Sequence, residues 1–267
     1  MQAGVVAAPR GLDAAYLTRL QRLRGRGWAL IPVASIVGVI FAIRYASETA
    51  SWLTYLALVA VPILAALALG WVARGARPWL AVIALGLFVV AWRTPYSLSG
   101  EAAGAVLSGL SCVTLGALLA AVTPSRWLKL GIIAMACADV WLIASDQLQA
   151  PNNQLVAARP GGGLPQLQSE QFGSISMGYG DMFVAALLGG VYAARVGVQR
   201  AAALLTLVAA ALFDLLFLVA DNLPATVPVA LALLIVEVGL ARGRLRGPVS
   251  ACCDRSMPED GIPPPAT

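Results

Sequence analysis

The sequence predicts an all-α fold, a polytopic bundle of about eight transmembrane helices. Hydrophobic residues make up 60% of the 267 and charged residues only 12%, which is far outside the composition of soluble domains. The apolar residues are gathered into runs of about 14 to 23, and a helix needs about 20 to cross a bilayer. Most basic residues lie at the ends of these runs, where they set topology, so the net charge of +5 does not indicate nucleic-acid binding.

The chain has three parts, and eight apolar runs make up the middle one. Residues 1–27 form a basic segment, 28–246 the transmembrane domain, and 247–267 a Pro-rich, charged tail that is expected to be disordered. The third run is the shortest, so the count of spans depends most on that run. The predicted spans are 28–43, 52–72, 79–92, 102–122, 130–148, 172–194, 201–220 and 225–241.

The basic residues alternate between the two ends of the runs. The N-terminal segment, the second, fourth and sixth loops and the C-terminus each carry two or more, whereas the other loops carry at most one. Because positively charged flanks stay in the cytoplasm, both termini are predicted to be cytoplasmic. The connection at 149–171, which contains three consecutive glycines, is then expected outside as a flexible link. The Ala- and Arg-rich composition favours a prokaryotic plasma membrane as the location.

Two aspartates lie near the middle of consecutive runs. Asp139 is the tenth residue of 130–148, and Asp181 is the tenth residue of 172–194. An ionisable side chain at the bilayer centre costs about 2.5 to 3.5 kcal/mol or more, so it persists mainly where it has a function. Two facing carboxyl groups can share one proton and act as acid and base, as in an aspartyl protease. The structural alternative is a hydrogen bond between packed helices.

Three other acids have different expected roles. Asp146 lies two turns after Asp139 and is expected to be a solvated structural acid near the outer surface. Asp214 lies within the seventh run and is a further functional candidate. Glu237 lies near the cytoplasmic end of the last run and is expected to pair with Arg242. The four cysteines have no metal-ligand spacing and the chain has no His, so neither a metal nor a cofactor is expected.

Residues 178–181 read Gly-Tyr-Gly-Asp, which resembles the Gly-x-Gly-Asp motif of the presenilin and signal peptide peptidase family of intramembrane aspartyl proteases. The family's other acid lies in the preceding span, as Asp139 does here, although Ala138 replaces the usual Tyr. The family's Pro-Ala-Leu before the last span corresponds to Pro-Ala-Thr at 224–226, so that Thr226 replaces the Leu.

The resemblance implies a presenilin-like bundle and an endopeptidase that cleaves peptide bonds within transmembrane helices or signal peptides. The family has nine spans, so this chain, as a bacterial or archaeal-type homologue, looks like a version without the first. The predicted topology resembles that of signal peptide peptidase, which implies substrates with a cytoplasmic N-terminus; membrane lipid is the other partner. The implied catalytic residues are Asp139 and Asp181, and the implied substrate-binding residues are Gly178, Tyr179, Gly180, Leu223, Pro224 and Ala225.

Two other functional classes share parts of the pattern. A proton-coupled transporter that uses Asp139, Asp181 and Asp214 is the main alternative, although no inverted repeat is detectable. The run at 176–181 is also close to the potassium-channel filter Thr-Val-Gly-Tyr-Gly-Asp. A channel is less favoured because only residues 182–194 remain before Arg195, too few for the inner helix that follows a filter. Prepilin peptidases share Gly-x-Gly-Asp but usually have a Lys soon after it.

Overall fold

The computed structural model describes residues 24–45, 48–95, 97–145, 147, 149–172, 175–218 and 223–243. These residues are mainly helical, which confirms the predicted all-α class apart from one short hairpin. The tail at 247–267 and most of the segment at 1–27 lie outside the described residues.

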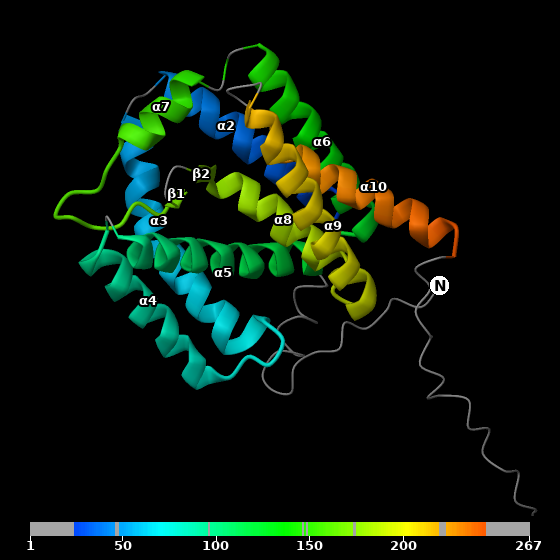
Figure 1. The fold of residues 1–267 in the computed structure, drawn as a ribbon, viewed down its shortest axis with the longest axis horizontal. Helices are drawn as coiled ribbons and strands as arrows, with labels where there is room; N and C mark the ends of the chain where they lie inside the picture. Colours follow the sequence, from blue (N-terminus) through cyan, green and yellow to red (C-terminus); the bar gives the residue numbers. More distant parts are fainter. Residues whose placement is uncertain are drawn as a thin grey trace, which may run out of the picture.

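A helix begins within or close to each of the eight predicted spans (Figure 1). The longer elements are α2 (Ile31–Tyr45), α3 (Glu48–Leu67), α4 (Ala81–Arg93), α5 (Leu98–Val122), α6 (Ser125–Ala144), α8 (Tyr179–Val191), α9 (Val196–Asp214) and α10 (Val227–Ala241). The shorter ones are η1 (Gly27–Leu30), η2 (Ala68–Val72), η3 (Pro78–Leu80), α7 (Gln149–Ala157), β1 (Ser169–Phe172), β2 (Ile175–Gly178) and η4 (Leu215–Leu218).

Four of the described helices are long and apolar enough to cross a membrane. The other four apolar helices are shorter, as α8 and α10 illustrate. Large apolar side chains on the outside, such as Trp52 and Leu207, are 74% and 65% exposed, which suits contact with lipid rather than water. The chain is therefore a membrane protein by the length and composition of its helices. The four long segments are Glu48–Val72, Leu98–Val122, Ser125–Ala144 and Val196–Asp214.

The helix α5 is the centre of the bundle. In Figure 1 it lies between α4 below and α8 above, α3 crosses it, and its most extensive contact is with α8. Many of its buried residues are small or weakly polar, among them Gly104, Ser108 and Ser111. Small residues let helix backbones approach closely. Such close packing is a main stabilising contribution to helix association in a membrane, where lipid and protein interior are both apolar.

The closest approach of α5 and α8 involves two glycines. A Cβ atom added at Gly116 would lie 2.9 Å from the carbonyl atoms of Ala186, and one added at Gly190 would lie 2.9 Å from the carbonyl oxygen of Gly116. Real Cβ atoms do not come this close to backbone, so neither position has room for a side chain. The two helices therefore pack backbone against backbone at this point.

The prediction of one continuous span at 172–194 is wrong in its first part. Residues 175–178 form β2, and the helix begins only at Tyr179. The sequence Ile175-Ser176-Met177 alternates apolar and polar residues, a period that fits a strand better than a helix. The run was apolar enough for a span by length alone, and length does not distinguish a strand followed by a helix from a single helix.

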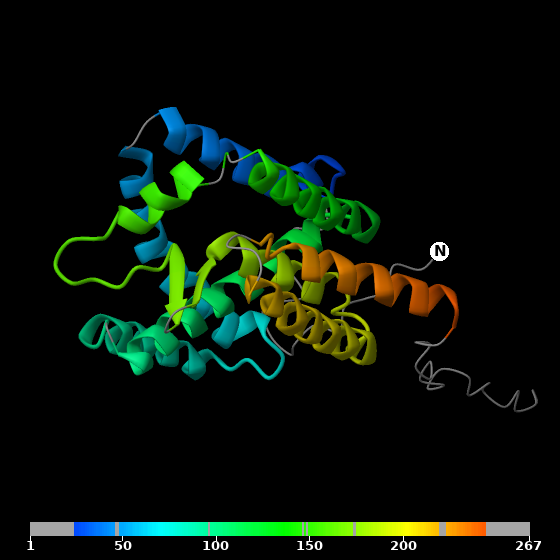
Figure 2. The same cartoon turned by 45° about the horizontal axis from the view of Figure 1, so that its top comes forward.

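The predicted flexible link at 149–171 is also wrong, because much of it has regular structure. It contains α7, which lies against α2 and α3, and the strand β1 (Figure 2). The Thr54 hydroxyl donates to the carbonyl oxygen of Ala158 at 2.9 Å, and the Gln168 amide donates to the same oxygen at 3.0 Å. Leu167 is 1% exposed in a cluster that includes Leu107 of α5. This connection therefore anchors the hairpin to the first half of the bundle.

We expect that one added methyl group at the α5–α8 contact destabilises the protein. In Gly116→Ala the new Cβ meets backbone atoms of Ala186, which cannot rotate away, and overpacking of this kind costs about 1–3 kcal/mol. Gly109→Ala is the matched control, because Gly109 lies on the same helix and a Cβ there meets nothing within 4 Å. Thermal unfolding in detergent micelles should show a lower midpoint for Gly116→Ala only. Equal midpoints in the two variants would contradict the close contact.

Candidate active site

The hairpin ends where α8 begins, and this junction places Asp181. β1 and β2 are antiparallel, with Ser169 opposite Gly178. Gly178 is extended, at φ −72° and ψ 147°, and Tyr179 is the first residue of α8. Asp181 is therefore in the first turn of the helix rather than in its middle. The free N–H groups and the positive end of the helix dipole favour a carboxylate there.

The carboxyl group of Asp181 folds back over the glycine that precedes the helix. A Cβ atom added at Gly178 would lie 3.2 Å from Oδ2 of Asp181, which is tighter than ordinary van der Waals contact. At Gly180 an added Cβ would meet nothing within 4 Å. Of the two glycines in the motif, Gly178 is thus the one whose missing side chain gives the carboxyl group its room.

Asp139 lies on α6 and is bound by the residue that departs from the family pattern. The Thr226 hydroxyl donates to Oδ2 of Asp139 at 2.7 Å, and the backbone N–H of Thr226 points at the same oxygen from 3.4 Å. Thr226 is 3% exposed, and it is the N-cap residue of α10. Sequence reasoning treated Thr226 as a departure and did not foresee this contact. The signal was a hydroxyl in an otherwise apolar segment, which needs a hydrogen-bond partner when buried.

The structure brings the two predicted catalytic aspartates together. Asp139 and Asp181 lie on helices that pack against each other, and both side chains are half-buried. They come from α6 and α8, and the start of α10 lies beside them through Thr226. Two carboxyl groups that come into contact can share a proton with each other and with a bound water.

An apolar cavity of about 340 Å³ lies between α8, α9 and α10. Asp181 is the one ionisable residue in its lining, and Met177 of β2 and Ala225 lie in the same wall. Much of the remaining surface comes from small side chains of α9, such as Ala203 and Ala210. A mostly apolar hollow with one acid can hold an apolar chain segment and present it to that acid.

Tyr179 has a different position from the one its motif implied. Its hydroxyl lies 2.8 Å from Oγ of Ser111 on α5, and its ring packs against the cluster around Leu107. The Cys112 thiol points at the carbonyl oxygen of Tyr179 from 3.8 Å. Tyr179 is not among the residues that line the cavity. In this structure its side chain fastens the N-terminus of α8 to α5.

The remaining predicted residues lie at varying distances from the cavity. Leu223 and Pro224 are half-buried in the segment before α10, next to Ala225 in the cavity wall. Asp214 is the last residue of α9, exposed, and absent from the cavity lining. Asp146 lies outside the described residues. Among the described residues, no group of three His, Cys, Asp or Glu side chains has the arrangement of a metal site.

The predicted pairing of Glu237 with Arg242 is wrong. Glu237 instead pairs with Lys129 of α6, with Nζ and Oε1 2.7 Å apart, and accepts a hydrogen bond from Tyr192. The prediction considered charges close in sequence, whereas the partner comes from a helix packed alongside.

No protein-family model, curated protein or solved structure matches this chain. The interpretation of its function therefore rests on the chemistry of the site.

We expect Thr226→Val to destabilise the protein. Valine keeps the shape of threonine but loses the hydroxyl, and a side-chain hydrogen bond contributes about 0.5–1.5 kcal/mol. Thr226→Ser retains the donor and should unfold near the parent temperature. Thr206→Val is the control, because the Thr206 hydroxyl donates only to the carbonyl of Ala202 on its own helix, at 2.9 Å. If Thr226→Val and Thr206→Val have the same thermal midpoint in detergent, the bond to Asp139 contributes nothing.

Proposed function

We propose that this chain is an intramembrane aspartyl protease of the presenilin and signal peptide peptidase type, with Asp139 and Asp181 as the catalytic pair. One observation carries the proposal: Asp139 and Asp181 lie on two helices that pack against each other, α6 and α8, and Asp181 lines an apolar cavity. The order of the three short motifs along the chain supports the same function. Membrane-embedded acids without a task would be expected to be rare, because burying them is costly.

In the proposed reaction the two carboxyl groups share one proton. The ionised group takes a proton from a water whose oxygen attacks the scissile carbonyl carbon, while the protonated group donates to the carbonyl oxygen. The tetrahedral intermediate then collapses, the C–N bond breaks, and the leaving nitrogen takes up a proton from the pair. The Thr226 hydroxyl holds one oxygen of Asp139 in place during these steps.

The elements beside the aspartates suit an extended substrate. A helical peptide shields its own peptide bonds, so a transmembrane substrate must unwind before it can be cut. β2 leads directly into α8, and in the two-stranded sheet of the described residues it pairs with β1 alone. An unwound peptide that adds to the other edge of β2 would have its backbone next to Asp181. The non-helical segment at Pro224, next to Ala225 in the cavity wall, is a second stretch of extended backbone that could lie beside such a peptide.

The proposal includes eight membrane crossings, with both termini in the cytoplasm. The α8 helix has 13 residues and spans only about 20 Å, so the hairpin must complete this crossing. Strand backbone at membrane depth is tolerated where it is covered by protein or lines a wet cavity. A hairpin at this place is therefore consistent with access of water to the aspartates from the outer side.

Asp139→Asn and Asp181→Asn should each lower proteolysis by at least about 100-fold, because the pair can no longer share a proton. Asp214→Asn is the matched control, since Asp214 is a third acid within a predicted span and does not line the cavity. The measurement is cleavage of a model transmembrane helix by the purified protein in detergent, with and without a transition-state-mimicking aspartyl inhibitor. An Asp214→Asn variant as inactive as Asp181→Asn would show that the pair is misassigned.

The topology can be tested with a reporter enzyme that is active only outside the cytoplasm. We expect activity when it is fused after Ala158 and none when it is fused after Arg246, because the basic flanks hold the C-terminus inside. With this orientation the site should prefer helices that have a cytoplasmic N-terminus, such as signal peptides, over helices of opposite orientation. The reverse reporter pattern would overturn both the orientation and the substrate preference.

A further inference from the structure

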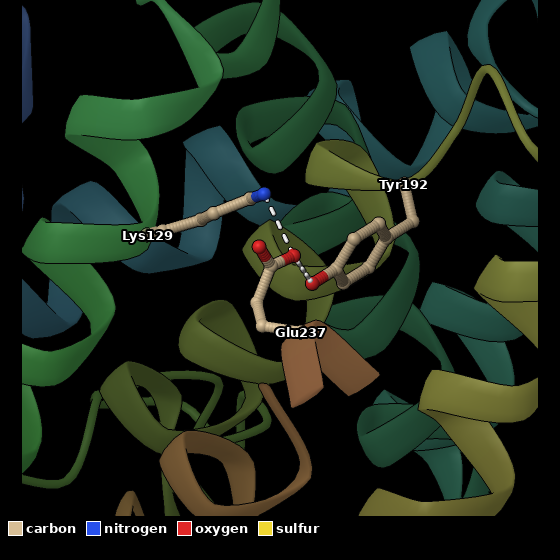
Figure 3. A network of polar contacts seen from close by, with 3 residues as sticks. All are labelled: Lys129, Tyr192 and Glu237. Carbon is tan, nitrogen blue, oxygen red and sulfur yellow. Dashed lines mark hydrogen bonds and ion pairs between the residues drawn. The ribbon is translucent and has the colours of Figure 1, made fainter. Parts of the chain in front are cut away.

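Three side chains from three helices meet near the predicted cytoplasmic end of the bundle (Figure 3). Lys129 of α6 forms an ion pair with Glu237 of α10, at 2.7 Å between Nζ and Oε1. The Tyr192 hydroxyl, at the C-terminal end of α8, donates to the same Oε1 at 2.5 Å. The Lys129 ammonium also lies 5.6 Å from the centre of the Tyr192 ring, within reach of a cation–π interaction. These three residues are called the cytoplasmic network below.

The cytoplasmic network joins the same three helices that form the candidate active site. Lys129 precedes Asp139 by ten residues on α6, Tyr192 follows Asp181 by eleven, and Glu237 follows Thr226 by eleven. At 1.5 Å per residue these separations are all about 15 to 17 Å. The two sets of contacts thus lie at opposite ends of the same helical stretches, and a shift of one helix at one end moves it at the other.

The two aspartates belong to different pairs of helices. Asp181 is on α8, which packs backbone against backbone on α5 at Gly116 and Gly190. Asp139 is on α6, which is bound to the start of α10 through Thr226. The separation of the carboxyl groups therefore depends on how the α5–α8 pair is held against the α6–α10 pair. Tyr192 and its two partners connect these pairs directly.

We infer that the cytoplasmic network is a positioning device that sets the distance between Asp139 and Asp181. The inference deepens the proposed function and rests on it. Lys129, Tyr192 and Glu237 are positioning residues, since none touches the cavity. Loss of the network should leave substrate binding in the cavity intact and disturb the geometry of the acid pair. Displacements of about 1 Å at reacting groups can reduce turnover by up to about 100-fold.

The kinetic test compares Glu237→Gln, Tyr192→Phe and Lys129→Met with the parent protein. Arg126→Met is the matched control for Lys129→Met, because both remove one positive charge from the start of α6 and Arg126 is exposed. With activity counted per inhibitor-titrated site, kcat should fall between about 10-fold and 100-fold in the three network variants, with KM nearly unchanged. The exchanged pair Lys129→Glu with Glu237→Lys should recover most of the turnover. A fall of the same size in Arg126→Met, or unchanged kcat in Glu237→Gln and Tyr192→Phe, would overturn the inference.

A distance measurement separates failure of this inference from failure of the proposed function. Spin labels at the exposed native Cys137 of α6 and at Met182→Cys of α8 report the spacing of the two helices near the aspartates in the full chain. The cysteines at 112, 252 and 253 are replaced by Ser for this purpose. Glu237→Gln and Tyr192→Phe should shift or broaden the distance distribution, and Arg126→Met should not. An unchanged distance distribution refutes the positioning role, whether or not the parent protein cleaves peptides. A shifted distribution together with no proteolysis by the parent protein refutes the proposed protease function but not the positioning role.

Discussion

The backbone contact between α5 and α8 fixes the position of the hairpin end and with it the position of Asp181. Gly116 and Gly190 allow the contact, and the Tyr179 hydroxyl secures the other end of α8 on Ser111. The helix is therefore held on α5 at both ends, and its first turn is directed at the cavity. The rest of the site is built against this fixed helix, because α6, α9 and α10 supply the second acid, the cavity wall and the Thr226 donor.

Three ionisable side chains of the apolar helices have compensating groups. Asp139 accepts from Thr226, Asp181 lies at the N-terminus of α8, and Glu237 has both Lys129 and Tyr192. An apolar surrounding penalises an unpartnered charge heavily, so such groups define how the helices can be arranged. Small residues thus allow the helices to pack closely, and a few polar residues determine which helices pair with each other.

The sequence was informative about helices and less so about what lies between them. Apolar runs located the helices because burial in lipid demands a stretch of that length, whichever neighbours it has. The strand before Tyr179 was not predicted, because the length of an apolar run does not distinguish a strand followed by a helix from a single helix. The Asp139–Thr226 and Lys129–Glu237 contacts join residues far apart in sequence, so only the packing of helices reveals them. The two motif aspartates were proposed from the sequence because acids stand out in an apolar run.

The α9 helix has little of its surface inside the protein. In the apolar stretch long enough to cross a membrane, 11% of α9 is buried, against 39% of α5. The α9 helix nevertheless supplies one wall of the cavity. Substitutions at weakly packed positions have small effects on stability. Residues such as Ala203 and Ala210 can therefore vary during evolution at little cost in stability, whereas a side chain at Gly116 or Gly190 would meet backbone atoms. Substitutions that change which substrate side chains the cavity accepts would therefore appear first on α9 in proteins descended from this one.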